Sequence, residues 1–463
     1  MGIGVFFLLL LLLLGGCSAV KEPSDTPETL QREFSLHPAA ELPADGVLTL
    51  TKAQEIALKN NPTCQAAAVS VQAARYGYLR SWSTYFPEIT VSSSVGQALE
   101  RGYDLHHPPA GIAPRKNRFD TSGNIEATLL LFDGLEREIN TLIAAEEYDR
   151  SAAVNENIRR LLLRSVAYTY WDILLACAES RIARADLFFQ ESALLQAERQ
   201  FAAGHVSKAA VLNFKLLAAK AQSDILFADY RAGIGKSALM ALLGFGQDAA
   251  FPELVLPEPD EIVIENRPLE FFMEQAIRNR PDLEELLIER KISRYRVKQV
   301  YAAFLPKIHL FAGFSAGSNA AAYGGYTYSH SYYNLTDFSY GIHGEWNLFR
   351  GLDSVRELQQ RKKLEKVADW EVRSKLLEIF SEVKDACLNC QNAAEQLKIF
   401  QEMVKWVQEQ RDLVFSEYTN GRETITRLNE AQSILVETEN RLAQIRFMQQ
   451  KAAAQLYAAI GLQ

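Results

Sequence analysis

The stretch TLLLFDGLERE at residues 128–138 changes its pattern at Gly134. Before the glycine the chain alternates and ends apolar, as a β-strand does, and after it the residues are charged and favour a helix. Nearly the same phrase, WNLFRGLDSVR, returns at residues 346–356. The two phrases predict the same strand-to-helix transition twice, and they indicate an internal duplication.

Other anchors support the duplication. Pro281 and Pro306 follow Pro62 and Pro87 at one common offset. Three glycines recur at an offset two residues shorter, so that Gly134, Gly204 and Gly244 match Gly351, Gly421 and Gly461. The first repeat is predicted at 48–247 and the second at 267–463. The proline-containing segment 248–266 between them is predicted to be a linker.

Each repeat predicts two shorter helices, two strands and two very long helices. A proline opens the second short helix, where its missing N–H costs nothing. The first long helix is predicted from Leu135 to about Ala202, with a return after Gly204, and the second from Leu352 to Tyr418, with a return after Gly421. Their apolar residues recur at coiled-coil-like spacing. Such helical hairpins predict a rod, or a tube assembled from several rods.

Four segments alternate between apolar and polar residues. The pattern predicts strands at about 88–103, 119–131, 307–317 and 335–349. It fits transmembrane strands with lipid on one side and a watery lumen on the other, or a soluble sheet with one wet face. Four strands are too few to close a barrel, and lipid does not tolerate an open edge, so a barrel would need several chains. Loops outside the cell are expected at 104–118 and 318–334.

The N-terminus predicts export. The apolar run at residues 5–17, VFFLLLLLLLGGC, is too short to span a membrane as a helix and matches the core of a signal peptide. We expect a signal peptide at 1–16 and a leader at 17–47. No later stretch reaches the roughly 18 apolar residues of a membrane helix. The segment Leu14-Gly15-Gly16-Cys17 resembles a bacterial lipoprotein cleavage box, which implies palmitate and other lipid on Cys17; the alternative is an ordinary signal with a chance cysteine.

Composition excludes several classes of protein. The chain is 48% hydrophobic and 23% charged with a net charge of −8, and no basic cluster suggests nucleic-acid binding. The phosphate-loop-like GIGKS at 233–237 falls inside a predicted helix and lacks the first glycine. Cys387 and Cys390 are interpreted as two small buried residues of a helix. No catalytic set, cofactor site or metal site is predicted, so we expect no enzyme.

The repeated motifs together resemble the TolC-type outer-membrane efflux proteins over about 48–463. They are NNP and NRP at the second helix, YFPEI and FLPKI before a strand, LFDG and LFRG after one, and the two glycine turns. The resemblance implies a mostly α fold with a β-barrel portion, completed as a homotrimer in the outer membrane with a helical tunnel in the periplasm. It also implies a periplasmic adaptor and an inner-membrane pump as partners.

Candidate site residues follow from this architecture. Pro87 and Pro306 are expected at the entry to the barrel, and Gly134 and Gly351 at its exit, where a strand must turn into a helix. The resemblance implies that residues past the second turn line a closed periplasmic aperture. The expected aperture residues are Tyr418, Glu423, Arg427 and Glu430, and the turns expected to contact the adaptor are Gly204, His205, Val206, Gly421 and Arg422.

The aperture departs from the pattern of the resembled family. Glu430 matches an acidic position, but Arg427 stands where the family often has aspartate. The two residues are three apart on one helix face, so they could pair within or between subunits and form a latch. The alternative is that they are solvated charges at a helix end.

Three functions fit the sequence. The first is the passive exit duct of a tripartite efflux system for small molecules. The second is the duct of an ATP-driven system that secretes proteins or peptides. The third is a structural lipoprotein of the periplasm and outer membrane without a conducting lumen, which the strand alternation and the duplication disfavour.

Overall fold

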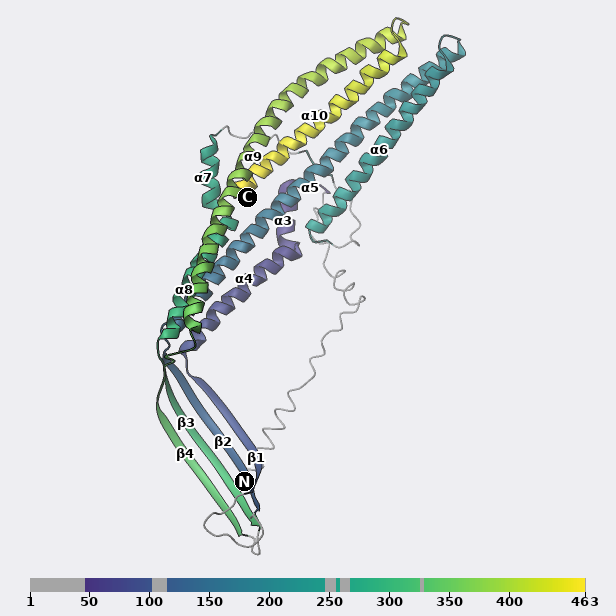
Figure 1. The fold of residues 1–463 in the computed structure, drawn as a ribbon. Helices are drawn as coiled ribbons and strands as arrows, with labels where there is room; N and C mark the ends of the chain where they lie inside the picture. The colour runs from purple at the N-terminus through teal and green to yellow at the C-terminus, as the bar shows by residue number, and fades with distance from the viewer. Residues whose placement is uncertain (1–45, 102–114, 246–254, 259–266, 325–328, 463) are drawn as a thin grey trace. The chain divides into compact units, whose positions relative to one another are not determined.

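The computed structural model describes residues 46–101, 115–245, 255–258, 267–324 and 329–462 (Figure 1). The expected signal peptide, Cys17 and nearly all of the leader lie outside these residues. The chain divides into two compact units. The hairpin unit contains Met1–Gln65, Leu161–Asn266 and Ala386–Ala458, and the sheet unit contains Ala66–Arg160, Arg267–Asp385 and Ala459–Gln463.

The two repeats contain the same elements in the same order (Figure 1). The first has α3 Leu50–Asn60, α4 Pro62–Ser81, the 3-10 helix η1 Trp82–Tyr85, β1 Glu88–Arg101, β2 Arg115–Phe132, α5 Glu136–Ala202 and α6 Lys208–Leu242. The second has α7 Leu269–Asn279, α8 Pro281–Val300, the 3-10 helix η2 Tyr301–Phe304, β3 Lys307–Gly324, β4 Ser329–Glu345, α9 Asp353–Thr419 and α10 Ile425–Ala459.

The long helices have matching lengths in the two repeats. Helices α5 and α9 contain 67 residues each, and α6 and α10 contain 35 each. At 1.5 Å per residue, α5 and α9 extend roughly 100 Å. The predicted starts at Leu135 and Leu352 are wrong by one residue, because both residues adopt a left-handed backbone, with φ of 70° and 69°.

One window of α5 is apolar enough to resemble a membrane span. Its mean hydropathy over 18 residues is 1.3, which corrects the expectation that no such stretch follows the signal. Half of that window is buried inside the protein, as in the core helix of a water-soluble unit. The window is therefore weak support for a membrane helix.

The four strands form one antiparallel sheet in the order β1-β2-β3-β4 (Figure 1). The register places like residues on one face: Leu310 lies opposite Leu129 and Ile342, and Phe314 lies opposite Ile125 and Phe338. The apolar residues of neighbouring strands therefore project to the same side, and the sheet has an apolar face and a more polar face. Strands β1 and β4 are the two edges within the described sheet.

The strand pairing extends further than the alternation suggested. Strand β3 continues to Gly324 and β4 begins at Ser329, so the loop expected at 318–334 is mostly strand. At the other end β4 stops at Glu345, short of the expected 349. The reason is that Glu345 pairs with Lys307, the first residue of β3, so the residues after Glu345 have no partner on that strand.

The core of the hairpin unit connects the short first helix to the long hairpin. Leu48 and Ile56 pack with Val166 and Ile173 of α5 and with Leu239 of α6. Gly235 allows a close approach, because a Cβ there would lie 2.7 Å from Ile173 Cγ1. The GIGKS motif thus lies within α6, where its second glycine serves helix packing.

Candidate functional site

The turns at the tips of the two helical hairpins have the same backbone. Gly204 and Gly421 have φ of +81° and +71°. The N–H groups of Gly204 and His205 donate to carbonyls three and five residues back, both at 2.9 Å, and those of Gly421 and Arg422 do so at 3.0 and 2.9 Å. This Schellman arrangement ends a helix and requires a left-handed residue, which explains the glycines. His205 and Arg422 are exposed, and Val206 is half-buried.

Arg427 and Glu430 pair within one chain. Arg427 Nη1 lies 2.8 Å from Glu430 Oε2 on the exposed side of α10. The first turn of this helix is capped by Thr424, whose Oγ1 accepts from the Arg427 N–H at 3.3 Å, and Glu423 Oε2 accepts from the Thr424 N–H at 3.2 Å. The pair is 45% and 55% exposed, so solvent screens it and its contribution to stability is small.

Tyr418 lies away from the surface that carries this pair. Only 6% of it is exposed, and its ring packs at 6.5 Å from the ring of Phe214 in a core shared by both hairpins. Its hydroxyl has no hydrogen-bond partner among the described residues. Burial raises the pKa of Tyr418. Within a single chain, the structure therefore does not bring Tyr418 together with the other expected aperture residues.

A buried polar group behind the tip core was missed by sequence reasoning. Asp186 accepts hydrogen bonds from the side-chain amides of Gln432, at 2.8 Å, and Gln190, at 3.1 Å. Burial also raises the pKa of Glu439, against the opposing charge of Arg411. These side chains come from different long helices, so no local sequence pattern identified them.

Both junctions between strand and helix use two consecutive left-handed residues. Gly134 and Leu135 have φ of 75° and 70°, and Gly351 and Leu352 have φ of 62° and 69°. A bulky residue rarely adopts such a backbone, so its recurrence marks a constrained turn. The sequence pointed to the glycines, but nothing in it signalled the leucines. Pro87 and Pro306 directly precede β1 and β3, as expected for the entries.

The first junction is held by side-chain hydrogen bonds and close packing within the chain, whereas the glycine of the second junction has free space around it. Asp133 is buried, and its Oδ2 accepts from the Arg137 N–H at 2.9 Å. Arg137 Nη1 donates to the Leu130 carbonyl at 3.0 Å, and its guanidinium lies 4.1 Å from the centre of the Tyr85 ring. A Cβ on Gly134 would lie 3.0 Å from backbone atoms of Ala302, whereas one on Gly351 would meet nothing within 4 Å.

A second glycine contact joins the end of each repeat to its beginning. A Cβ on Gly244 would lie 2.5 Å from the Asn60 carbonyl oxygen, and one on Gly461 would lie 2.6 Å from that of Asn279. We call these contacts the first joint, in the hairpin unit, and the second joint, in the sheet unit. In the first joint, Asn61 Nδ2 donates to the Leu242 carbonyl at 3.0 Å.

The second joint contains a buried network of charges. Arg280 and Asp282 form a two-bonded pair, with the shorter bond 2.6 Å, and Asp282 also lies 3.0 Å from Lys375 Nζ and 3.5 Å from Arg160 Nη2. Arg280 further contacts Glu382. Burial opposes ionisation of Asp282, but the bonds and charge of Arg280, the bond from Lys375 and the charge of Arg160 outweigh it. They hold the pKa of Asp282 well below its usual range.

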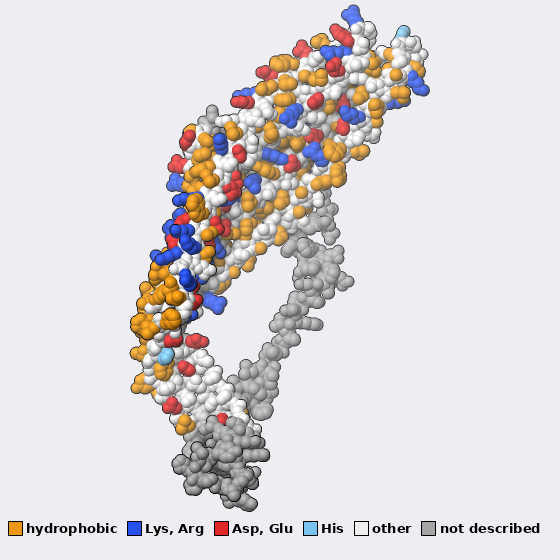
Figure 2. All heavy atoms as spheres, in the orientation of Figure 1, with side chains coloured by type: hydrophobic (Ala, Val, Ile, Leu, Met, Phe, Trp, Pro, Cys, Tyr) orange, Lys and Arg blue, Asp and Glu red, His pale blue; other side chains and the backbone are white. Residues whose placement is uncertain are grey.

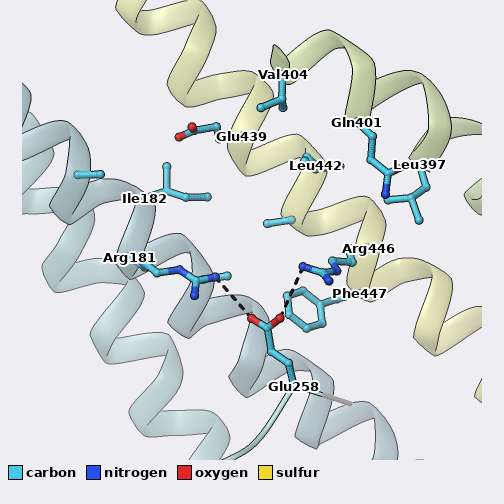
Figure 3. A pocket seen from close by; sticks show the side chains of 13 residues that line it. Arg181, Ile182, Glu258, Leu397, Gln401, Val404, Glu439, Leu442, Arg446 and Phe447 are labelled. Carbon is cyan, nitrogen blue, oxygen red and sulfur yellow. Dashed lines mark hydrogen bonds and ion pairs between the residues drawn. The ribbon is translucent and has the colours of Figure 1, made fainter. Parts of the chain in front are cut away.

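A cavity of about 480 Å³ in the hairpin unit lies between α5, α9 and α10 (Figure 3). Its walls combine apolar with polar and charged side chains, and Glu258 lies between two cations, with Arg181 and Arg446 each 3.5 Å away. The linker segment 255–258 is held there by Tyr170, whose hydroxyl donates to the Pro257 carbonyl at 2.9 Å. Burial raises the pKa of Tyr170 to about 12, so it stays a donor.

The described residues contain no group of three or more potential metal-binding side chains. Cys390 is 5% exposed, and burial with the neighbouring Cys387 raises its pKa to about 12, so its thiol is unreactive. What the arrangement offers is a pair of long hairpins with exposed tips, two constrained junctions and a two-faced sheet. These features support passage or attachment.

Comparisons with known proteins agree with this arrangement. A family model described as outer membrane efflux protein matches residues 54–245 and 272–462, one match in each repeat. The pyoverdine export outer membrane protein OpmQ of Pseudomonas aeruginosa is 26% identical over 326 residues, which cover 69% of this chain and 64% of that protein. The cation efflux system protein CusC of Escherichia coli K12 is 23% identical over 423 residues, covering 88% and 84%.

Solved structures share the fold. VceC from Vibrio cholerae has a TM-score of 0.71 at 18% identity, over 89% of this chain and 96% of that one. The outer membrane channel CmeC of Campylobacter jejuni has a TM-score of 0.74 at 15% identity, over 89% and 85%. The chain thus spans less than two thirds of the Pseudomonas aeruginosa OpmQ and most of the length of the other proteins compared.

Proposed function

Because this chain belongs to the outer membrane efflux protein family, we propose that it is the outer-membrane channel of a tripartite efflux system. It would be a passive exit duct for small molecules, loaded by an inner-membrane pump through a periplasmic adaptor. The observation that carries the proposal is the duplicated architecture, in which each repeat joins two alternating strands to one long helical hairpin. The family locates the protein in the bacterial outer membrane.

The sheet supports a barrel made by several chains. Strands β1 to β4 contain 14 to 18 residues, more than the 9 to 11 that cross a bilayer. Their apolar face is exposed in the single chain, with Val91 73% and Tyr340 76% accessible. Edges β1 and β4 need partners in lipid. Three chains of four strands would close a twelve-stranded barrel.

An exposed aromatic band lies where the helices of the sheet unit meet the strands. Figure 2 shows hydrophobic side chains gathered there. Aromatic rings favour the boundary between the hydrocarbon core and water. We therefore assign this level to the periplasmic surface of the membrane. The exposed residues of the band include Trp82, Phe86, Trp346 and Phe349.

The long helices also leave apolar residues uncovered in one chain. On α9, Leu388, Ile399, Trp406 and Leu413 are 52% to 64% exposed. Their spacings of 7 and 11 residues are close to whole helical turns, so they share one face. A continuous apolar stripe on a water-exposed helix is a surface for another helix. We propose that homotrimerisation covers it and builds the tunnel wall.

We extend the proposal to the ends of the duct. Cys17 would carry lipid and anchor the mature chain in the outer membrane, beside the barrel. The tip turns at Gly204, His205 and Val206 and at Gly421 and Arg422 would contact the adaptor. Glu423, Arg427 and Glu430 would line the aperture, where Arg427 and Glu430 act as a latch.

Photo-crosslinking in living cells tests the proposal. A photoreactive amino acid is placed at Val206 or Arg422, and captured proteins are identified by mass; a matched control carries it at Phe188, an exposed α5 residue away from the tips. We expect one adaptor at both tip positions and not at the control. If that adaptor belongs to an ATP-driven protein exporter, the duct serves secretion instead. Capture of no adaptor while the pump is expressed would contradict the duct and favour a structural lipoprotein.

A further inference from the structure

Two histidines that are far apart in the sequence face each other across the sheet. In the antiparallel pairing of β3 and β4, His309 is the direct partner of His343. Directly opposed residues project to the same face, and their Cβ atoms lie about 4.5–5.5 Å apart. This face is opposite the one that carries Leu310 and Ile342, and it also holds Leu130, the partner of His309 on β2. The two imidazoles are therefore neighbours on the side of the sheet that faces away from lipid in the proposed barrel.

We propose that His309 and His343 form a binding site for a borderline divalent transition-metal cation, such as Ni²⁺, Cu²⁺ or Zn²⁺. Imidazole nitrogen binds these ions at about 2.0–2.1 Å. Two imidazoles on opposed positions can hold one ion between them. His309 is half-buried and His343 is exposed, so the site is open to solvent on the face where a cation would arrive.

The neighbouring pairs of the ladder favour a cation. On one side Lys307 is opposite Glu345, but the Lys307 ammonium is bound to Glu136 at 2.8 Å. The Glu345 carboxylate accepts a hydrogen bond from Asn347 at 3.1 Å and lies two residues from His343 on the same face of the strand. Because opposite charges attract over several ångströms, this carboxylate supports a bound dication without ligating it.

The pair on the other side shapes the site. Phe311 lies opposite Gly341, and a Cβ on Gly341 would come within 3.1 Å of the Phe311 ring. The ring therefore occupies the space above the glycine, next to the histidine pair. The pair is thus flanked along the ladder by an aromatic ring on one side and an acidic group on the other.

The ligand set predicts which ions bind and how tightly. No third histidine, cysteine or carboxylate joins the pair as a ligand group among the described residues, so water completes the coordination. Two ligands make a weaker site than the three or four of catalytic and structural zinc sites. Mg²⁺ and Ca²⁺ prefer oxygen ligands and are excluded. Among first-row ions the affinity should follow Cu²⁺ above Ni²⁺ and Zn²⁺.

Metal titration of the full-length protein in detergent tests the site. NiCl₂, ZnCl₂ and MgCl₂ are titrated separately by calorimetry into the wild type, His309→Asn and His343→Asn. We expect Ni²⁺ and Zn²⁺ to bind the wild type, each single variant to bind about tenfold more weakly or worse, and Mg²⁺ not to bind. His205→Asn and the double variant His106→Asn/His107→Asn are the matched controls, and both should bind as the wild type does.

Two results would overturn the proposal. One is unchanged binding in either single variant, because a site that needs only one imidazole is not this pair. The other is loss of binding in the His106/His107 control alone, which would assign the metal to that segment. Cross-linking of a His309→Cys/His343→Cys variant with a short bifunctional thiol reagent checks the register separately: a cross-link is expected, and its absence would remove the geometric basis. Neither measurement involves transport, so the outcome is independent of the proposed duct.

Discussion

The two repeats share their backbone geometry and differ in the side chains that hold it. Both joints use a left-handed glycine, Gly244 or Gly461, that contacts the carbonyl before an Asn-Pro or Arg-Pro turn. In the first joint the neutral amide of Asn61 satisfies the end of α6. In the second joint, Arg280 Nη1 donates to the corresponding carbonyl, that of Ala459, at 3.3 Å. The same guanidinium forms ion pairs with Asp282 and Glu382.

The difference shows which features the fold demands and which are local solutions. The glycines recur because a Cβ would collide with backbone in both repeats, and backbone cannot move aside cheaply. The residue before each proline, Asn61 or Arg280, is free to vary as long as the final carbonyls of a helix find donors. In the second repeat a charged side chain, Arg280, donates to such a carbonyl and is itself paired with Asp282. The stability of the second joint therefore depends on pH, whereas that of the first joint, which uses a neutral amide, does not.

The largest expected effect separates the two joints. Asp282→Ala should lower the free energy of unfolding by about 3–5 kcal/mol, because it leaves the buried guanidinium groups of Arg160 and Arg280 without their shared anion. Thr63→Ala, the matched position of the first repeat, is exposed and should change it by less than about 0.5 kcal/mol. Urea denaturation followed by helical circular dichroism measures both. Similar losses would show that the charges are not what distinguishes the joints.

The junctions should also respond unequally. Gly351→Ala forces a left-handed alanine and should cost about 1–2 kcal/mol. Gly134→Ala carries the same strain and in addition pushes a Cβ to 3.0 Å from Ala302, which should add about 1–3 kcal/mol. The same denaturation experiment compares them. An equal or larger cost at Gly351 in the isolated chain would mean that the second junction is packed more tightly than the structure indicates.

Acid should weaken the second joint selectively. The pKa of Asp282 is lower in the folded chain than in the unfolded one, so its contribution is present above the unfolded pKa of about 3.9 and is lost as the pH falls toward the folded value. Asp282→Asn lacks this contribution at every pH. The stability difference between wild type and Asp282→Asn should therefore narrow between about pH 5 and pH 2. A constant difference over that range would contradict the assignment.

The smallest effect on stability is expected at the tip of the second repeat, where Arg427 and Glu430 form an exposed ion pair. Arg427→Ala with Glu430→Ala should change the free energy of unfolding by less than about 0.5 kcal/mol, because the pair is exposed. If the pair closes the aperture, single-channel conductance in a lipid bilayer should rise. The first-repeat counterparts, Ala210 and Asn213, offer the control Asn213→Ala, which should leave conductance unchanged. No rise in the double variant would reject the latch.

Local signals were enough to predict the helices, their turns and the duplication. The proline at the start of α4 and α8, the glycine at each tip and the alternation of the strands act within a few residues of chain. In the structure these elements lie close to their predicted positions, and the main differences are at the ends of the strands. Strand β4, for example, ends where β3 has no further residues to pair with. Barrel closure and trimerisation stay predictions, because they depend on other copies of the chain.

The sequence by itself therefore determined the order of the elements and the length of the long helices, because periodicity, proline and glycine constrain the backbone locally. Only the tertiary structure decided which distant residues meet. It buried Tyr418 against Phe214, gathered Arg160, Asp282 and Lys375 from three helices, and set His309 opposite His343. Such contacts depend on helix packing and strand register, and a shift of one residue in register would send a side chain to the other face of the sheet.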